Sequence, residues 1–459
     1  MLKFINSNKI ILIFLVIFIT SLVYSFSFKY KPLVDAKAYD KIAWNLARGF
    51  GYREFLDGEL ARDHAIIRAG PGYEFFLAAI YKIFGHSYSA VWLMQSFLHA
   101  LSAFLVFLLT KNILSYEKKE SMALIAMVFY GFFPDMIISA SMLLTETLSI
   151  FLLLLSVFIF LRFIDKACQH LVLTRKLSTP GVGIILLGLV SSVMVLVRAQ
   201  LGLIILPLLF FWILKKQWFH IIIFFVLFIL VLIPWTLRNY SLYGKIIPTT
   251  ALLGNNLSMG NHPGASGEQL DTPYAPWEEF FKDRDYIKGD KLALNLALNF
   301  IKENPLEFVK TTLYRTSVYF SFSRPTGFWP NFSALNKLLT IIFSGLYSGL
   351  IFILSFAGIL FILKRRKSQD LFFREKLNYI LLIMALMPIS VIFIVIETRY
   401  RYPIYPFLAI FSGVSFYWLL LKRKEILRPL LYSFLIIGGN TAFDILRNFG
   451  RIIGRINNL

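Results

Sequence analysis

The sequence predicts an all-α protein that crosses a membrane many times. Of its 459 residues, 58% are hydrophobic and 17% aromatic, whereas only 16% are charged. This balance is typical of membrane proteins rather than of soluble domains. Ten apolar segments approach or exceed the roughly 20 residues that a helix needs to span the hydrocarbon. These segments cover residues 10–28, 88–112, 121–140, 143–164, 180–197, 200–214, 217–237, 340–363, 377–396 and 403–421.

Basic residues in alternate loops predict the orientation of these helices, because Lys and Arg stay on the cytoplasmic side of a membrane. Residues 29–87 and 238–339 then lie on the outer side. The formal net charge of +21 is attributed mainly to topology and contact with anionic lipid rather than to nucleic acid. The cytoplasmic set is Lys111, Lys118, Lys119, Arg162, Lys166, Arg175, Lys176, Lys215, Lys216, Lys364, Arg365, Arg366, Lys367, Arg374, Lys376, Lys422, Arg423, Lys424 and Arg428.

The expected organisation has four parts. Residues 1–237 form a transmembrane core that includes the first outer loop, 29–87. Residues 238–339 form a small outer domain, 340–421 the last transmembrane helices, and 422–459 a basic tail that is cytoplasmic or interfacial. Within the tail, residues 430–446 contain Gly438, Gly439, Asn440 and Asp444, so we expect a surface segment rather than an eleventh span.

Short helices are expected outside the spans. In the first outer loop, apolar spacing and flanking glycines indicate helices over residues 38–48 and 73–84, both suited to the membrane interface. In the outer domain we expect one helix over about 290–303. These short elements, together with the helix ends, are where the chemistry must reside.

Four arginines lie at the outer face, where the positive-inside rule does not place them: Arg198, Arg238, Arg399 and Arg401. Ionisable groups near the hydrocarbon are costly and are usually kept for pairing or function. A guanidinium group can fork onto phosphate oxygens, so the four could hold a lipid phosphate. The alternative is that they extend toward headgroups or pair with Glu146 and Glu397.

Two carboxylates are expected at the same depth. Asp35 follows the first apolar segment and could do acid/base chemistry at the outer mouth of the protein; alternatively it caps the helix that begins near Ala36. Glu146 begins an apolar segment and could position a substrate or simply pair with an arginine. Asp40 is expected to face water. His64 and His86 are too isolated to predict a metal site.

Five motifs in order resemble bacterial glycosyltransferases of the GT-C superfamily, in the branch related to protein O-mannosyltransferases and lipid A aminoarabinose transferases. The resemblance covers residues 1 to about 420. The motifs are Asp35–Gly51 (DAKAYDKIAWNLARGFG), Arg68–Tyr73 (RAGPGY), Leu144–Thr147 (LTET), Pro234–Tyr240 (PWTLRNY) and Glu397–Pro406 (ETRYRYPIYP).

The resemblance implies a GT-C type helical bundle of about ten transmembrane helices in the plasma (inner) membrane, with its active site on the outer face. It implies an inverting transfer of a hexose or pentose, as in mannosyltransferases, from a polyprenyl phosphate, with Asp35 as the general base and Glu146 shaping the site. No metal or other cofactor is required, and the acceptor is a glycan, glycolipid or protein. Phosphate contacts fall on Arg68, Arg198, Arg238, Arg399 and Arg401, and substrate-pocket candidates are Tyr39, Asp40, Tyr73, Tyr400 and Tyr402.

Two other functions remain open from the sequence. A transporter or flippase for lipid-linked oligosaccharides would bind pyrophosphate through the same arginines without chemistry. A glycan ligase or polymerase would use a pyrophosphate-linked donor. The ionisable groups collect at the outer ends of the apolar segments rather than at their centres, and this favours chemistry at the membrane surface over transport.

Overall fold

The computed structural model describes residues 7–173, 181–268, 284–323, 334–366 and 370–451. It confirms an all-α polytopic membrane protein: no strand occurs in these ranges, and one isolated bridge pairs Glu268 with Ile396. Seven of the described helices are long and apolar enough to cross a membrane, or eight if one bent pair is counted as a single span. The inner-loop residues Arg175, Lys176 and Lys367 lie outside the described residues.

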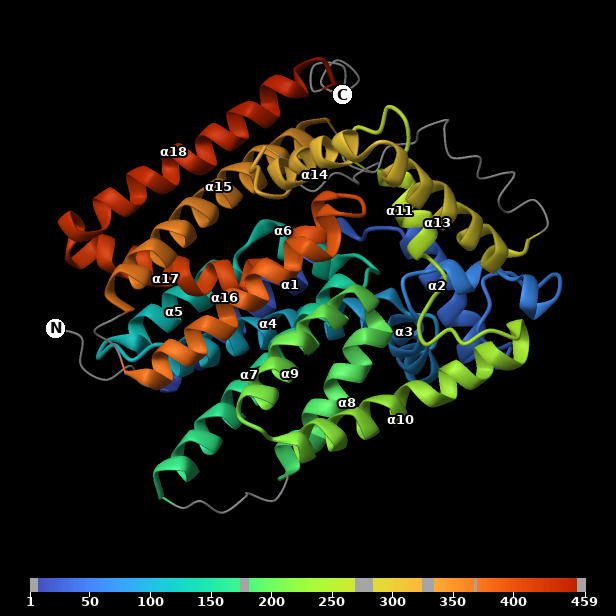
Figure 1. Ribbon diagram of the computed structural model, residues 1–459, viewed down its shortest axis with the longest axis horizontal. Helices are drawn as coiled ribbons and strands as arrows, with labels where there is room; N and C mark the ends of the chain where they lie inside the picture. Colours follow the sequence, from blue (N-terminus) through green and yellow to red (C-terminus); the bar gives the residue numbers. More distant parts are fainter. Residues whose placement is uncertain (1–6, 174–180, 269–283, 324–333, 367–369, 452–459) are drawn as a thin grey trace.

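The first half of the chain supplies a helical core and two short outer helices (Figure 1). After α1, the chain forms the outer loop and then returns through the core. The elements are α1 (Ser7–Phe28), α2 (Asp35–Ala47), η1 (Leu60–Arg62), η2 (His64–Ile67), α3 (Pro71–Phe84), α4 (Tyr88–Ile113), α5 (Lys119–Gly131), α6 (Pro134–Ser141), α7 (Glu146–Leu173), α8 (Val182–Val197), η3 (Ala199–Ile204), α9 (Ile205–Leu214) and α10 (Trp218–Tyr243).

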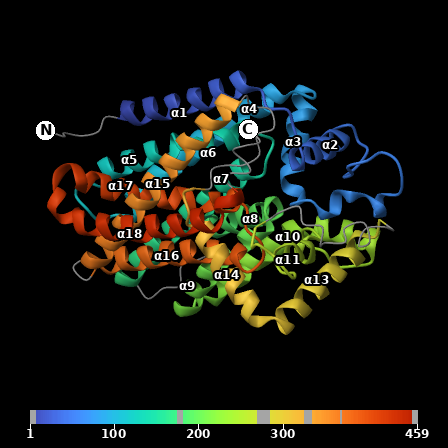
Figure 2. The ribbon, with the colours of Figure 1, turned by 90° about the horizontal axis from the view of Figure 1, so that it is seen from above.

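The second half adds the outer segment and the last long helices. Figure 2 shows α13 and α14 on one side of the molecule and α1 on the opposite side. These elements are α11 (Leu253–Gly260), α13 (Tyr286–Glu303), α14 (Pro305–Tyr319), α15 (Ala334–Arg365), α16 (Leu371–Ile392), η5 (Thr398–Ile404), α17 (Tyr405–Leu421) and α18 (Arg423–Arg447). The helix expected near 290–303 is therefore confirmed as α13.

The core lies where α17 packs against both α5 and α15. Small residues allow these backbones to approach closely, as is common between membrane helices. A Cβ atom on Gly413 would lie 2.6 Å from the carbonyl oxygen of Met122, and one on Gly358 would lie 2.2 Å from that of Phe411. Any larger side chain at these two positions would force the helices apart.

The segment expected as one span over 121–140 is broken into α5 and α6, which are bent by 52°. Pro134 is the first residue of α6. Because proline has no backbone N–H to continue a helix, the chain turns there. After the break and α6, residues 142–145 lead into α7, which begins at Glu146.

The tail differs from the expectation of a surface segment over 430–446. Residues 423–447 form one helix, α18, which packs along α15 and is long and apolar enough to cross a membrane. Its C-terminal end meets the outer segment, where Arg447 Nη2 lies 3.8 Å from Glu268 Oε1. The polar residues that argued against a span face protein: Asn440 donates to the Ser317 carbonyl, and Asp444 is buried and accepts from Ser323.

Both short helices expected in the first outer loop are present, as α2 and α3. Close packing at two glycines docks the start of α3 on the end of α8. Gly70 has a φ of 150°, and a Cβ there would lie 2.4 Å from the Leu196 carbonyl oxygen, while one on Gly72 would lie 2.8 Å from Val197 N. This contact brings the loop that carries Arg68 to the end of α8, where Arg198 follows.

Candidate active site

A cavity of about 770 Å³ opens between the first outer loop, residues 29–87, and the segment around α11. In Figure 1, α2, α3, α11 and α13 gather at the same end of the molecule. Charged, amide and apolar side chains all line the cavity. The sequence-predicted residues that it brings together are Asp35, Tyr39, Arg68, Glu146, Arg198, Arg399 and Tyr400.

Asp35 is the first residue of α2, but it does not cap that helix. The capping position is Val34, and no side chain caps the helix. Val34 has a φ of 47°, which is unfavourable for a β-branched residue. The Asp35 carboxylate instead accepts a hydrogen bond from Arg399, at 2.6 Å between Oδ2 and Nη2, and Oδ1 lies 3.9 Å from Arg68 Nη1. The capping interpretation is therefore wrong, and the carboxylate is available to the cavity.

Burial by itself would raise the pKa of the Asp35 carboxyl, but the neighbouring positive charges outweigh it. Arg399, with smaller contributions from Arg68 and Arg198, holds the pKa below its ordinary value. Asp35 is therefore ionised at neutral pH. An ionised carboxylate can accept a proton, although its present contact with Arg399 lowers its basicity.

The arginines of the cavity are all paired with carboxylates. Arg198 Nη1 lies 3.1 Å from Glu146 Oε1, and Arg399 Nε donates to Glu397 Oε2 at 2.8 Å. The Tyr400 ring lies near both guanidinium groups, with centroid distances of 5.6 Å to Arg198 and 6.0 Å to Arg399. The sequence offered pairing with Glu146 and Glu397 as the alternative to phosphate binding, and these pairs are present in the structure.

Arg68 is held by Glu54, a residue that the sequence did not single out. The guanidinium donates through Nε at 3.0 Å to Oε2 and through Nη2 at 2.9 Å to Oε1. His64 Nδ1 lies 3.1 Å from the same carboxylate. Burial alone would raise the pKa of Glu54, but the contacts with His64 and Arg68 lower it overall.

Five other predicted residues lie outside the cavity lining. Arg238 bonds to the Tyr52 carbonyl and stacks on Trp235, and Arg401 is buried and donates to the Ser321 carbonyl. The Tyr73 hydroxyl donates to Gln95, and Tyr402 is buried. Asp40, expected to face water, is also buried; it accepts from Tyr81 and Tyr88 and contacts His86. The expectation for Asp40 was wrong because α3 covers that face of α2.

Several lining residues carried no signal in the sequence. His64, Gln200, Asn255 and Asn256 contribute polar groups, and Leu203, Leu252, Leu253, Met259 and Ile394 contribute apolar ones. They come from η2, η3, α11 with the residue before it, and the residues that follow α16, which meet only in the fold. A cavity lined by both polar and apolar side chains suits an amphiphilic ligand. Asn255 and Asn256 lie in a Gly/Asn-rich stretch whose helix, α11, was not expected.

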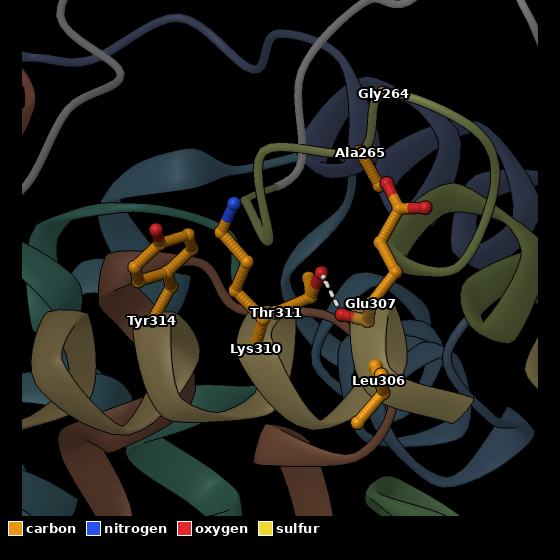
Figure 3. A pocket seen from close by; sticks show the side chains of 7 residues that line it. All are labelled: Gly264, Ala265, Leu306, Glu307, Lys310, Thr311 and Tyr314. Carbon is orange, nitrogen blue, oxygen red and sulfur yellow. Dashed lines mark hydrogen bonds between the residues drawn. The ribbon is translucent and has the colours of Figure 1, made fainter. Parts of the chain in front are cut away.

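A second cavity, of about 420 Å³, lies on the surface of α14. Figure 3 shows the side chains that line it, including Glu307, Lys310 and Tyr314, and the bond from Thr311 to the Glu307 carbonyl. It contains one acidic and one basic side chain and none of the arginines of the first cavity. We therefore place the candidate site at Asp35. Among the described residues, no group of three or more His, Cys, Asp or Glu could hold a metal ion.

The fold is similar to those of known membrane enzymes. The chain superposes on ArnT from Cupriavidus metallidurans bound to undecaprenyl phosphate, with a TM-score of 0.51, 11% identity, and coverage of 94% of this chain and 64% of that one. The chain has the GT-C fold. An oligosaccharyltransferase from Archaeoglobus fulgidus in the apo form gives a TM-score of 0.48 and 14% identity, over 94% of this chain and 55% of that one.

No family model matches this chain, and no curated protein matches it. The chain spans less than two thirds of the length of either solved structure. At these identities the likeness establishes the fold of a multi-pass membrane protein. What the chain does must be argued from the cavity.

Proposed function

We propose that this protein is a membrane glycosyltransferase that moves a sugar from a polyprenyl phosphate to an acceptor on the outer face of the plasma membrane. The observation that supports this most strongly is the position of Asp35. A carboxylate that is ionised at neutral pH lies in one cavity with three arginines, Arg68, Arg198 and Arg399. Base and phosphate-binding groups are thus adjacent, as a glycosyl transfer from a phosphate requires.

The proposed step is a single displacement with inversion. The donor phosphate binds the arginines, and the acceptor hydroxyl approaches the anomeric carbon from the opposite side. Asp35 takes the hydroxyl proton as the new carbon–oxygen bond forms. The bond between the anomeric carbon and the phosphate oxygen breaks, and its electron pair remains on the phosphate, whose charge the arginines neutralise. The step assigns no role to a metal or another cofactor.

Donor binding changes the environment of the base. Arg399 now bonds to Asp35, whereas a phosphate would compete for the same guanidinium. Loss of that contact would raise the basicity of Asp35 when the donor is present. The ion pairs with Asp35, Glu146 and Glu397 hold the arginines near their phosphate-binding positions, and the negative charge of the donor releases the base.

The apolar residues that line the cavity support a lipid-linked donor. Among them are Leu203 and Gly202 from η3, and Val391 and Ile394 near the end of α16. Leu206 and Phe393, close in sequence to these residues, are large apolar side chains that are exposed. A prenyl chain could leave the cavity past such side chains and enter the membrane. The relative with a bound undecaprenyl phosphate shares the fold.

A transfer assay with purified protein in liposomes tests the proposal. The donors are monosaccharides on polyprenyl phosphate or oligosaccharides on polyprenyl pyrophosphate, with a cell-envelope fraction as acceptor, and the released lipid carrier is measured. We expect release from the monophosphate donor. Release only from the pyrophosphate donor would favour a ligase or polymerase, and movement of intact lipid between leaflets without release would identify a flippase.

A further inference from the structure

His64 lines the cavity from a loop that is fixed at several points. The Asp63 carboxylate accepts hydrogen bonds from the backbone N–H groups of Ala65, Glu54 and Phe55, at 2.7–3.0 Å. Thr250 Oγ1 lies 2.6 Å from the carbonyl oxygens of both Ile66 and Arg68. The His64 ring also packs edge-on against Tyr286. The imidazole is thus held rigidly, which a recognition group requires.

Nδ1 of the ring has two partners in the same loop. Nδ1 lies 3.1 Å from Glu54 Oε2 and 2.9 Å from Arg68 Nη2. The Nη2 group already donates to both oxygens of Glu54, at 2.9 Å and 2.8 Å. Nδ1 can therefore donate to Glu54 or accept the second Nη2 hydrogen of Arg68, and it is engaged in either case. In the neutral ring, Nε2 accepts a hydrogen bond in the first case and donates one in the second.

Nε2 makes no hydrogen bond to any described residue, and His64 lines the cavity. Nε2 is thus the ring nitrogen available to a ligand, and it can accept a hydrogen bond from a sugar hydroxyl or donate one to it. Arg68 links His64 to the proposed phosphate-binding part of the site, because its Nη2 lies 2.9 Å from His64 Nδ1 and its Nη1 lies 3.9 Å from Asp35 Oδ1. A sugar attached to a phosphate at these arginines would therefore be within reach of His64.

We propose that His64 binds a hydroxyl group of the donor sugar through Nε2. This inference rests on the proposed function and adds a residue that recognises the sugar. The sequence excludes His64 only as part of a metal site, and its partner Glu54 lies ten residues earlier in the same loop.

Two substitutions separate the two ring nitrogens. His64→Asn keeps a polar atom near the position of Nδ1 and removes Nε2, whereas His64→Gln keeps a polar atom near Nε2. We measure the affinity of the purified full-length protein for a polyprenyl phosphate with and without a linked monosaccharide. His64→Asn should weaken binding of the sugar-linked lipid about tenfold, the effect of one lost hydrogen bond to a ligand. His64→Gln should weaken it less, and neither change should alter binding of the bare lipid phosphate.

A matched control is His86, which also pairs with a carboxylate, at 2.8 Å between Nε2 and Asp40 Oδ1, but does not line the cavity. His86→Asn should leave both affinities unchanged. An equal loss of both affinities in His64→Asn would overturn the proposal, because His64 would then act by holding Arg68. Unchanged donor affinity with slower transfer would overturn it in favour of acceptor binding. If unaltered protein binds neither lipid, the proposed function fails together with this inference.

Discussion

Asp35 and Asp40 are carboxylates of the same helix, α2, in contrasting environments. Asp35 is partly exposed in the cavity, and its partners Arg399 and Arg68 are charged groups that a phosphate could attract away. Asp40 is buried, and the hydroxyls of Tyr81 and Tyr88 donate to it. The number of contacts does not distinguish a carboxylate that supports the fold from one that is proposed to take part in a reaction. The difference is that the partners of Asp35 can be exchanged when a substrate enters.

The same contrast separates the arginines. Arg399 is bound to carboxylates and lines the cavity, whereas Arg238 bonds to the Tyr52 carbonyl and stacks on Trp235 outside it. Arg399→Gln should lower kcat/KM for the donor about 100-fold or more, because the developing phosphate charge loses a fixed donor. Arg238→Gln should lower it less than about threefold. Steady-state kinetics of donor consumption measure both, and equal losses would remove the distinction between the two arginines.

Asp40→Asn tests the carboxylate that supports the fold, in contrast to Asp35 in the cavity. It replaces a charged acceptor that serves Tyr81 and Tyr88, so we expect a loss of about 1–3 kcal/mol of stability with turnover nearly unchanged. Thermal unfolding in detergent measures the first effect and the transfer assay the second. A variant that is stable but inactive would mean that Asp40 also takes part in the chemistry.

Glu74 is buried on α3, and its substitution is expected to have the smallest effect. Desolvation raises the pKa of its carboxyl from 4.5 to about 8. Between these pH values the folded protein holds a proton that the unfolded chain releases, so stability falls as the pH rises through this range. Glu74→Gln removes this dependence. Its melting temperature should exceed that of the unaltered protein at pH 8 by about 2 °C or more and equal it at pH 4.

The sequence indicated that four candidate residues lie at one level, but not which way each side chain points. Asp35, Glu146, Arg198 and Arg399 each lie near the end of an apolar segment, and all four line one cavity. Their direction depends on tertiary packing. Arg399 and Arg401 are two residues apart in η5, yet only Arg399 lines the cavity.

Other features had no sequence signal. Glu54 and His64 lie in a loop without periodicity, and their pairing requires the turn that Asp63 fixes. The sequence also did not predict that α18 is one long apolar helix, because Asn440 and Asp444 are unusually polar residues for a membrane span. The polar residues of α18 find their partners on α14 and in the residues that follow it, and α15 packs along the same helix. The sequence of α18 alone cannot reveal these contacts.

The central claim is that the Asp35 carboxylate takes the proton of the acceptor, and single-turnover transfer by Asp35→Asn tests it most directly. The amide keeps the size of the side chain but cannot accept the proton. The account predicts that transfer falls by 10²-fold or more, while the melting temperature stays close to that of the unaltered protein and the donor still binds. Near-normal transfer by this variant, with donor bound, would contradict the assignment.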